Sequence, residues 1–332
     1  MEISQGRKDT MSRRVKAECS ASGAVSIGQR SRSGTRKRIW KYRYIYLFLL
    51  PAVIWFIAFA YTPMVGLLLA FKDFKYNMGI LGSPWVGLKY FKNFLSDPMF
   101  FRVIRNTLKI SLLKMAFGFP APIILALMIN AVTNSKFKRT VQTVSYMPYF
   151  VSWVVVITML SKFLSPTNGL INDIRVQKGL EAIYFQGKPN LFYPLVILTD
   201  IWKNIGWNSI IYLSALTGID PGLYEAAEIE GAGRWAKTWH ITLPGIRPTI
   251  GILFIMNLGG ILNAGYEQIL LMQTPPVMDV AEVLDTYVLQ RGLKMNQFGY
   301  ATAIGLFSSV ISLILVVVTN YISRKTTEVS LW

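Results

Sequence analysis

The chain has 332 residues, of which 52% are hydrophobic and only 16% are charged, whereas soluble domains carry roughly 25% charged residues. This deficit excludes a soluble two-domain enzyme and predicts a protein of the lipid bilayer. The net charge of +18 does not indicate nucleic-acid binding, because much of it precedes the first apolar run and no nucleic-acid-binding motif accompanies it.

Residues 1–38 are polar, rich in Ser, Gly and Arg, and without periodicity. We expect them to form a disordered basic cytoplasmic tail, because a basic stretch beside a span keeps that end inside. The tail holds the single cysteine, Cys19, which excludes an intrachain disulfide and a multi-cysteine metal site. Residues 39–332 are predicted to form one all-α transmembrane domain.

Six apolar runs in this domain are long enough to cross a hydrocarbon core about 30 Å thick. They lie at about Ile45–Phe71, Leu108–Val132, Val141–Leu164, Phe192–Leu216, Thr249–Met272 and Ala301–Ile322. If the N-terminus is inside, the basic loop after the second run, the loop 218–248 and the C-terminus are inside too. This agrees with the positive-inside rule, so both termini are predicted to be cytoplasmic.

The fourth run contains two charged residues, Asp200 and Lys203. Charges are costly in hydrocarbon and should face the protein interior or water. The two residues are three apart and can meet on one helix face. We therefore predict a structural ion pair between them, in preference to a substrate site.

The loop between the fourth and fifth runs has a legible local pattern. Asp220 suits a helix N-cap and Pro221 the first helical position. Gly231 can adopt the left-handed conformation that ends a helix. A second short helix is expected from about Ala232 to Ile241, stopping before Pro244. The pattern predicts a projecting helix–turn–helix. An ordinary long cytoplasmic loop is the alternative when only these local signals are considered.

The same loop resembles the EAA motif of binding-protein-dependent (MetI-like) ABC importer permeases. The matching positions are Glu225-Ala226-Ala227, Gly231, Ile241-Thr242-Leu243-Pro244 and Pro248. Other stretches resemble the carbohydrate branch and its LplB-like polysaccharide permeases, namely Trp85–Leu88, Tyr146–Trp153, Gly265–Gln268 and Ser330–Trp332. The resemblance covers about residues 40–332.

The resemblance implies a six-helix type I importer permease whose loop 218–248 is a cytoplasmic coupling helix docked on an ATPase. It assigns the ATPase contact to Glu225, Ala226, Ala227, Glu228, Gly231, Leu243 and Pro244. The sequence has no Gly-x-x-x-x-Gly-Lys-Ser/Thr phosphate loop, so a partner subunit should bind the ATP. We expect no cofactor, metal or catalytic residue in this chain, and hence no enzyme.

The implied assembly lies in a bacterial inner or plasma membrane. It joins this chain to a second homologous permease subunit, two copies of the ATPase and an extracytoplasmic solute-binding protein. The implied function is the ATP-driven import of oligosaccharides or polysaccharide fragments, with this chain forming half of the translocation path by alternating access. Membrane lipid is the remaining expected partner.

Polar and aromatic residues in the third and fifth runs suit a carbohydrate path, because sugars are bound by stacking and by amide or carboxylate hydrogen bonds. The candidates are Tyr266, Glu267, Gln268, Asn263, Asn257, Tyr149 and Trp153. Hydrogen bonds between helices are the alternative for the polar residues, and an interfacial aromatic belt is the alternative for Tyr149 and Trp153.

The first outer loop, residues 72–107, is basic and so departs from the positive-inside rule. Its charges could contact lipid headgroups, dock the external binding protein or attract an acidic sugar. Within it, the helical spacing of apolar residues from Leu88 to Leu95 predicts an amphipathic helix along the membrane surface.

Three other functions stay open, one of which is a membrane-bound sensor or scaffold. The importer could take another solute, such as a glycerophosphodiester or a peptide. The chain could also be an ion-coupled secondary transporter, although carboxylates within the apolar runs are sparse.

Overall fold

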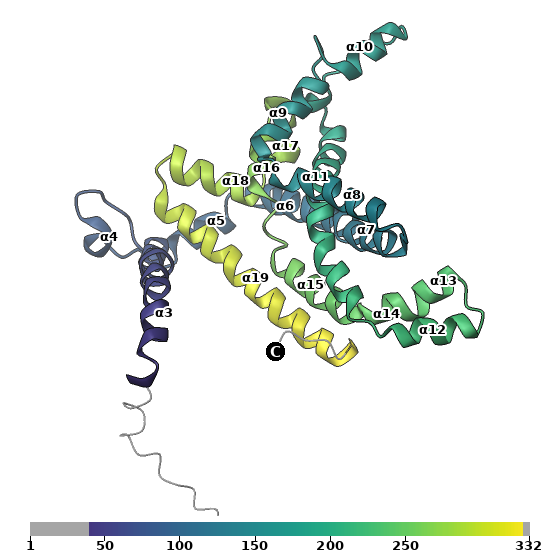
Figure 1. The fold of residues 1–332 in the computed structure, drawn as a ribbon. Helices are drawn as coiled ribbons and strands as arrows, with labels where there is room; N and C mark the ends of the chain where they lie inside the picture. The colour runs from purple at the N-terminus through teal and green to yellow at the C-terminus, as the bar shows by residue number, and fades with distance from the viewer. Residues whose placement is uncertain (1–39, 328–332) are drawn as a thin grey trace, which may run out of the picture. The chain divides into compact units, whose positions relative to one another are not determined.

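The computed structural model describes residues 40–327. The predicted tail of residues 1–38 and the C-terminal Ser330–Trp332 stretch therefore lie outside the described residues. Between residues 40 and 327 the chain is helical, and the one bridge between extended segments joins Lys72 to Trp85. This confirms the predicted all-α class (Figure 1).

The described residues fall into two compact units that divide between Met64 and Val65. The first unit contains α3 (Arg43–Phe56) and a π turn (Ile57–Tyr61). Neither segment has a buried residue, although both are strongly apolar. A helix that is apolar and unburied on every side needs lipid or another helix to cover it.

A 3₁₀ segment (Thr62–Phe71) crosses the division into the second unit. The helices that follow are α4 (Gly79–Gly82), α5 (Lys89–Leu95), α6 (Phe100–Leu113), α7 (Pro120–Ala131), α8 (Ser135–Tyr146), α9 (Trp153–Phe163), α10 (Leu170–Gln177), α11 (Pro189–Thr217), α12 (Pro221–Ile229), α13 (Arg234–Lys237), α14 (Leu243–Gly245), α15 (Arg247–Gly259), α16 (Tyr266–Met272), α17 (Met278–Ala281), α18 (Leu284–Leu289) and α19 (Phe298–Thr327). Short π turns (Lys114–Gly118, Thr238–Thr242, Gln290–Lys294) and 3₁₀ turns (Met147–Phe150, Phe185–Gly187, Pro275–Val277) connect some of them.

Three helices among the described residues are long and apolar enough to cross a membrane, namely Arg43–Phe71, Phe100–Ala131 and Phe298–Lys325. Two bent pairs raise the number to five, Ser135–Phe150 with Trp153–Phe163 (98°) and Arg234–Gly245 with Arg247–Gly259 (58°). The remaining predicted run, the fourth (Phe192–Leu216), corresponds to α11, which has 29 residues. It is not among these candidates because charged and amide side chains occupy its middle.

The predicted fifth run, Thr249–Met272, is not one continuous helix. α15 ends at Gly259, and the chain leaves helical geometry before α16 begins at Tyr266. Gly265 in this break has a φ of +84°, a backbone conformation that glycine adopts without steric cost. The break places backbone polar groups at the depth of the fifth run, which membrane proteins tolerate where the backbone lines a cavity.

The second unit is organised around α11, which packs against α7, α8 and α15. A Cβ on Gly206 would overlap the backbone of Ser145 in α8, so the two helices touch through their main chains. One apolar cluster joins α6, α9, α11 and residues 264–283. A second cluster joins α7 and α11 to Ile246.

The predicted amphipathic helix is present as α5. Its apolar face is only partly open, because Phe94 is buried in a cluster with Val103, Tyr287 and Ile304. Leu88 and Leu95 remain exposed. The helix is thus anchored on the protein, and its position at a membrane surface stays a prediction.

Candidate functional site

A cavity of about 370 Å³ lies between α6, α7, α11 and the break after α15. Amide side chains supply much of its polar lining, which includes Asn208, Asn257 and Asn263. Lys114 and Asp200 bring one charge of each sign to the same wall. The cavity therefore presents hydrogen-bonding groups without a net charge of its own, which suits a polar, hydroxyl-rich solute.

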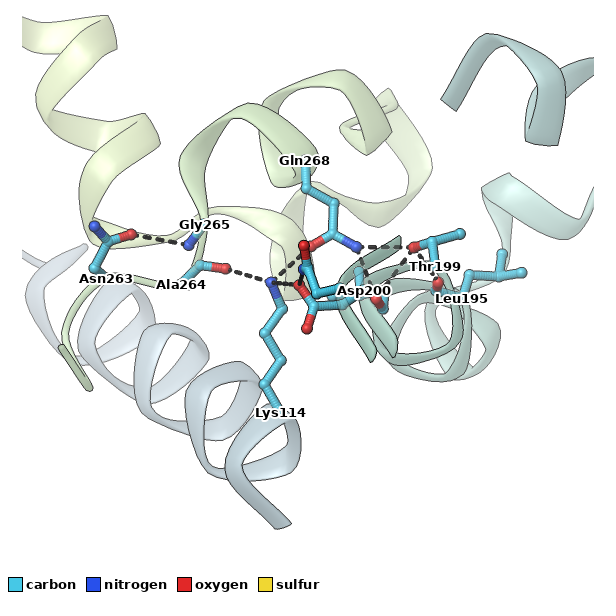
Figure 2. A network of polar contacts seen from close by, with 10 residues as sticks. Lys114, Leu195, Thr199, Asp200, Asn263, Ala264, Gly265 and Gln268 are labelled. Atoms are coloured by element: carbon cyan, nitrogen blue, oxygen red, sulfur yellow. Dashed lines mark hydrogen bonds and ion pairs between the residues drawn. The ribbon is translucent and has the colours of Figure 1, made fainter. Parts of the chain in front are cut away.

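Lys114 is the centre of a polar network that ties three segments together (Figure 2). Its Nζ atom lies 3.2 Å from Oδ1 of Asp200 on α11. The same ammonium donates to the carbonyl of Ala264 at 2.9 Å and to Oε1 of Gln268 at 2.6 Å. All three N–H donors of Lys114 thus have partners, as a charge inside a membrane protein requires.

Gln268 extends this network into the core. Its Nε2 atom donates to the carbonyl of Val196 at 2.7 Å and to Oγ1 of Thr199 at 2.8 Å. The side chain of Gln268 is fully buried. Both ends of its amide are hydrogen-bonded, so Gln268 fixes α16 to α11 beside the cavity and leaves no group free for a solute.

Local sequence explains why the network can close. Lys114 begins a π turn (Lys114–Gly118), an insertion that is frequent at functional sites. A Cβ on Gly265 would lie 3.0 Å from the Lys114 Nζ atom and would crowd the ammonium, and the φ of +84° itself favours glycine. Asn263 Oδ1 accepts the Gly265 N–H at 3.0 Å and shapes the turn.

The predicted ion pair between Asp200 and Lys203 is wrong. Asp200 pairs with Lys114, whereas Lys203 donates to the carbonyls of Tyr149 and Val151. The Lys203 ammonium also lies over the rings of Tyr149 and Trp153, at 5.4 and 5.5 Å from their centroids. These contacts with other segments are favoured over the pairing within α11, because they give each buried charge several partners instead of one.

The structure separates the predicted path residues into four groups. Asn257 and Asn263 line the cavity, and Gln268 lies behind it as a buried support. Tyr266 and Glu267 are exposed side chains outside its lining. Tyr149 and Trp153 surround Lys203, and Tyr149 stacks on Trp207 with 4.5 Å between the ring centroids.

Sequence reasoning missed Lys114 and Asn208. A signal for Lys114 was present, because a lysine inside an apolar run needs a counter-charge, and Asp200 was the carboxylate in the fourth run. The pairing itself depends on how α6 and α11 pack, which the sequence pattern does not specify.

The loop after α11 forms the predicted capped helix. The Asp220 side chain accepts the Gly222 N–H at 2.9 Å and caps α12. At the other end Gly231 has a φ of +76°. The Ala232 N–H bonds to the Ala227 carbonyl and the Gly231 N–H to the Glu228 carbonyl, the pattern of a Schellman C-cap.

Two side-chain contacts hold α12 against the returning chain. Lys237 Nζ lies 2.6 Å from Oε1 of Glu228, and its hydrogen bond and charge lower the pKa of the Glu228 carboxyl. The Tyr224 hydroxyl lies 3.0 Å from Oγ1 of Thr242. α12 and α13 project from the end of α11 (Figure 1), and Ile229 is 89% exposed at the tip.

The second helix of this loop does not stop before Pro244 as predicted. Helical geometry continues from α13 through a π turn (Thr238–Thr242) into α14, and the bend comes only after Gly245. In the π turn the Leu243 N–H donates to the Thr238 carbonyl, five residues earlier. This wider turn carries the chain to Pro244, which is then accommodated in the first turn of α14.

Comparison with known proteins identifies relatives of this chain. Residues 118–328 match the family described as "Binding-protein-dependent transport system inner membrane component". The polygalacturonan/rhamnogalacturonan transport system permease protein YteP of Bacillus subtilis (strain 168) is 43% identical over 311 residues, 94% of this chain and 97% of its own length. Protein LplB of the same organism is 44% identical over 283 residues, 85% of this chain and 89% of its own length.

A solved structure is similar as well. It is that of a bacterial ABC transporter involved in the import of the acidic polysaccharide alginate. One of its chains superposes with a TM-score of 0.81 at 41% identity, and the match covers 88% of the present chain and 99% of that chain. A second structure of a bacterial alginate ABC transporter, in complex with an alginate pentasaccharide-bound periplasmic protein, gives the same TM-score of 0.81.

Proposed function

The chain belongs to the family of binding-protein-dependent transport system inner membrane components, and we propose that it is the permease subunit of an ATP-driven importer for oligosaccharides or polysaccharide fragments. It forms half of a translocation path in a bacterial membrane. Its role is transport, and a partner subunit hydrolyses the ATP.

The amide-lined cavity carries this proposal. Asn208 on α11, Asn257 on α15 and Asn263 in the break after α15 offer donors and acceptors at the depth of the apolar runs. Such groups are costly in hydrocarbon unless they line a pathway or pair across helices. The break after α15 adds backbone groups at the same level. Hydroxyl-rich sugars match this lining, and the transport systems of YteP and of the solved alginate transporter act on polysaccharides.

The uronate content of those substrates narrows the proposed substrate class for this chain. Polygalacturonan and alginate are both acidic polymers. The basic side chains of residues 72–107 support an acidic cargo for this chain too. We therefore propose uronate-containing oligosaccharides as the substrate class.

The loop 218–248 is proposed as the ATPase contact. Glu225 and Ala226 on α12 are exposed, Ala227 is half-buried, and the Schellman cap at Gly231 fixes the direction of the chain after α12. A rigid projecting helix of this kind can transmit movement to α11 and α15, which flank it in the chain. Two ATPase copies, a second homologous permease and an extracytoplasmic binding protein would complete the transporter, with both termini of this chain in the cytoplasm.

The test is reconstitution of the complete transporter in proteoliposomes, with uptake of labelled oligogalacturonate and ATP hydrolysis measured together. The binding protein is added outside the proteoliposomes and ATP is enclosed in their lumen. The wild type should accumulate the sugar in the lumen only when this ATP is present. Gly231→Val should uncouple hydrolysis from uptake, because valine is strained at a φ of +76° although no atom lies within 4 Å of its Cβ.

Two matched controls separate backbone strain from side-chain bulk. Gly231→Asn should keep most of the coupling, since asparagine tolerates the left-handed region. Gly233→Val should behave as wild type, because Gly233 has a φ of −71° and open space around it. Normal coupling in Gly231→Val would argue against the docking role, and ATP-independent uptake in the wild type would overturn the importer proposal.

A further inference from the structure

A second pocket is formed by segments other than those that line the central cavity. It has a volume of about 600 Å³ and is formed by residues 73–74, α5, residues 97–98 and the segment from Arg291 to Tyr300. We call it the outer pocket, because the proposed orientation places all of these segments outside the cytoplasm. It shares no lining residue with the central cavity.

Aromatic rings held in fixed positions form much of the outer pocket's wall. The Tyr90 hydroxyl donates to Oδ1 of Asp73 at 3.0 Å, and the Tyr300 hydroxyl donates to Oδ2 of Asp97 at 2.9 Å. Phe298 packs edge-to-face against Phe74 with 6.0 Å between the ring centroids. Carboxylates thus fix the phenols, so the rings offer rigid surfaces on which a sugar ring can stack.

Four polar side chains of the outer pocket have hydrogen-bonding capacity to spare. They are Lys89, Asn93, Asn296 and Gln297. Over residues 40–327, no hydrogen bond or ion pair engages the side chain of any of these four. The acidic residues differ, since Asp73 accepts from Tyr90 and Asp97 accepts from Tyr287, Tyr300 and the Met99 N–H.

A left-handed turn at Asn296 and close packing at Gly299 shape the outer pocket. Asn296 has a φ of +56°, the one positive φ of a non-glycine residue between residues 40 and 327. Asparagine tolerates this left-handed conformation, and the turn places Asn296 and Gln297 in the lining. A Cβ on Gly299 would lie 2.6 Å from Tyr90 and 2.8 Å from the Leu69 carbonyl, so the start of α19 packs closely against α5 and the 3₁₀ segment.

Size and chemistry together favour a small solute over a protein. The volume falls in the range of roughly 300–1,000 Å³ typical of small-molecule pockets. Fixed aromatic faces beside free amides match a carbohydrate. The unpaired ammonium of Lys89 favours a sugar that carries a carboxylate.

We propose that the outer pocket is a carbohydrate site that binds a uronate-containing unit before it enters the central cavity. Lys89 pairs with the sugar carboxylate, Asn93 and Gln297 bind hydroxyls, and the rings stack on the sugar. This inference rests on the proposed function and orientation, and it explains why an outer loop that departs from the positive-inside rule is basic.

A local fluorescence reporter tests the site. Cys19→Ser removes the single cysteine, and Lys294→Cys adds one beside the outer pocket without altering its lining. The assembled transporter, labelled there with an environment-sensitive dye and held in nanodiscs without binding protein, is titrated with trigalacturonate and with neutral maltotriose. Trigalacturonate should give a saturable signal that weakens with salt, and maltotriose a much weaker one.

Lys89→Ala and Asn93→Ala should each weaken trigalacturonate binding by about fivefold to tenfold. Lys92→Ala is the matched control, because it removes the same charge from the same helix but lies outside the outer pocket. It should leave the affinity within about twofold. Equal effects of Lys89→Ala and Lys92→Ala would mean nonspecific attraction and would overturn the site.

Two further outcomes would also overturn it. A signal from purified binding protein but none from trigalacturonate would show that the outer pocket is a protein-docking surface. No signal from either would show that it binds neither of them. Uptake by the same preparation in proteoliposomes keeps the two proposals apart. Normal uptake with a silent pocket refutes only this site, whereas absent uptake in the unlabelled wild type refutes the importer.

Discussion

At the scale of single residues, Lys114 is the clearest case of a side chain whose role depends on distant partners. It lies in an apolar helical run, where an unpaired ammonium would be strongly unfavourable. Asp200, Gln268 and the Ala264 carbonyl come from 86 to 154 positions further along the chain. The network therefore holds the cavity wall together by joining segments that are far apart in the sequence.

Replacing Lys114 with methionine should destabilise the protein by about 2 kcal/mol, because the change leaves the Asp200 carboxylate and the Gln268 carbonyl without their donor. The midpoint of thermal unfolding in detergent measures the effect. Adding Asp200→Asn to Lys114→Met should recover part of the loss, since the uncompensated charge is removed. A strictly additive double variant would show that the two residues are not coupled.

Asp97 makes a pH-dependent contribution outside the membrane-spanning helices. Burial alone would raise the pKa of its carboxyl, but hydrogen bonds from Tyr287, the Met99 N–H and Tyr300, with the Arg291 charge, lower this pKa below its usual 3.8. A lowered pKa means that the folded state favours the carboxylate. The resulting stabilisation is fully present above about pH 4 and is lost as the pH falls through the folded-state pKa.

Asp97→Asn should therefore remove part of the acid sensitivity of the fold. Unfolding midpoints measured from pH 7 down to pH 3 should fall more steeply below about pH 4 in the wild type than in the variant. Asp173→Asn is the control, because that exposed carboxylate has no ion pair among the described residues. Parallel curves for the wild type and Asp97→Asn would contradict the assignment.

At the scale of elements, the contact between α8 and α11 depends on one glycine. A Cβ on Gly206 would overlap the Ser145 carbonyl, so even alanine must push the helices apart. Small residues that allow helix backbones to approach closely are typical of membrane helix pairs. This contact fixes the part of α11 that follows Asp200 and Lys203.

Gly206→Ala should destabilise the protein by about 1–3 kcal/mol through overpacking. Gly305→Ala is the matched control, because Gly305 lies within α19 and no atom is within 4 Å of its Cβ. That control should be neutral or slightly stabilising, since alanine is the better helix former. Detergent unfolding midpoints compare the two, and equal midpoints would show that α8 can move away without cost.

Features that depend on residues close together in the sequence could be predicted, whereas features that depend on distant segments could not. The cap at Asp220 and the left-handed Gly231 were predictable because both depend on neighbours a few residues away. The predicted Asp200–Lys203 pair was wrong because the local spacing competes with Lys114, just after α6, and with the carbonyls of Tyr149 and Val151. The break before Gly265 was missed for a related reason, since apolar composition continues through it while the cavity requires the backbone to turn.

At the scale of the whole molecule, orientation decides which side each proposed surface faces. The basic inner segments and the exceptional outer loop were both visible in the sequence. If the proposed orientation is correct, α12 meets the cytoplasm and the outer pocket meets the binding protein's side. Both proposed contacts therefore depend on one topological question that a labelling experiment can answer directly.

Single-cysteine labelling in intact cells with a membrane-impermeant maleimide gives that answer. In a Cys19→Ser background, Lys75→Cys on the first outer loop should react from outside, whereas Glu230→Cys after α12 should react only after permeabilisation. Both parent side chains are exposed, so accessibility should be limited by the membrane and not by the fold. The unsubstituted chain provides a third reporter, because Cys19 in the basic tail should also be protected in intact cells. Labelling of Glu230→Cys from outside would invert the orientation, which would separate α12 from a cytoplasmic ATPase and place the outer pocket on the wrong side for an incoming sugar.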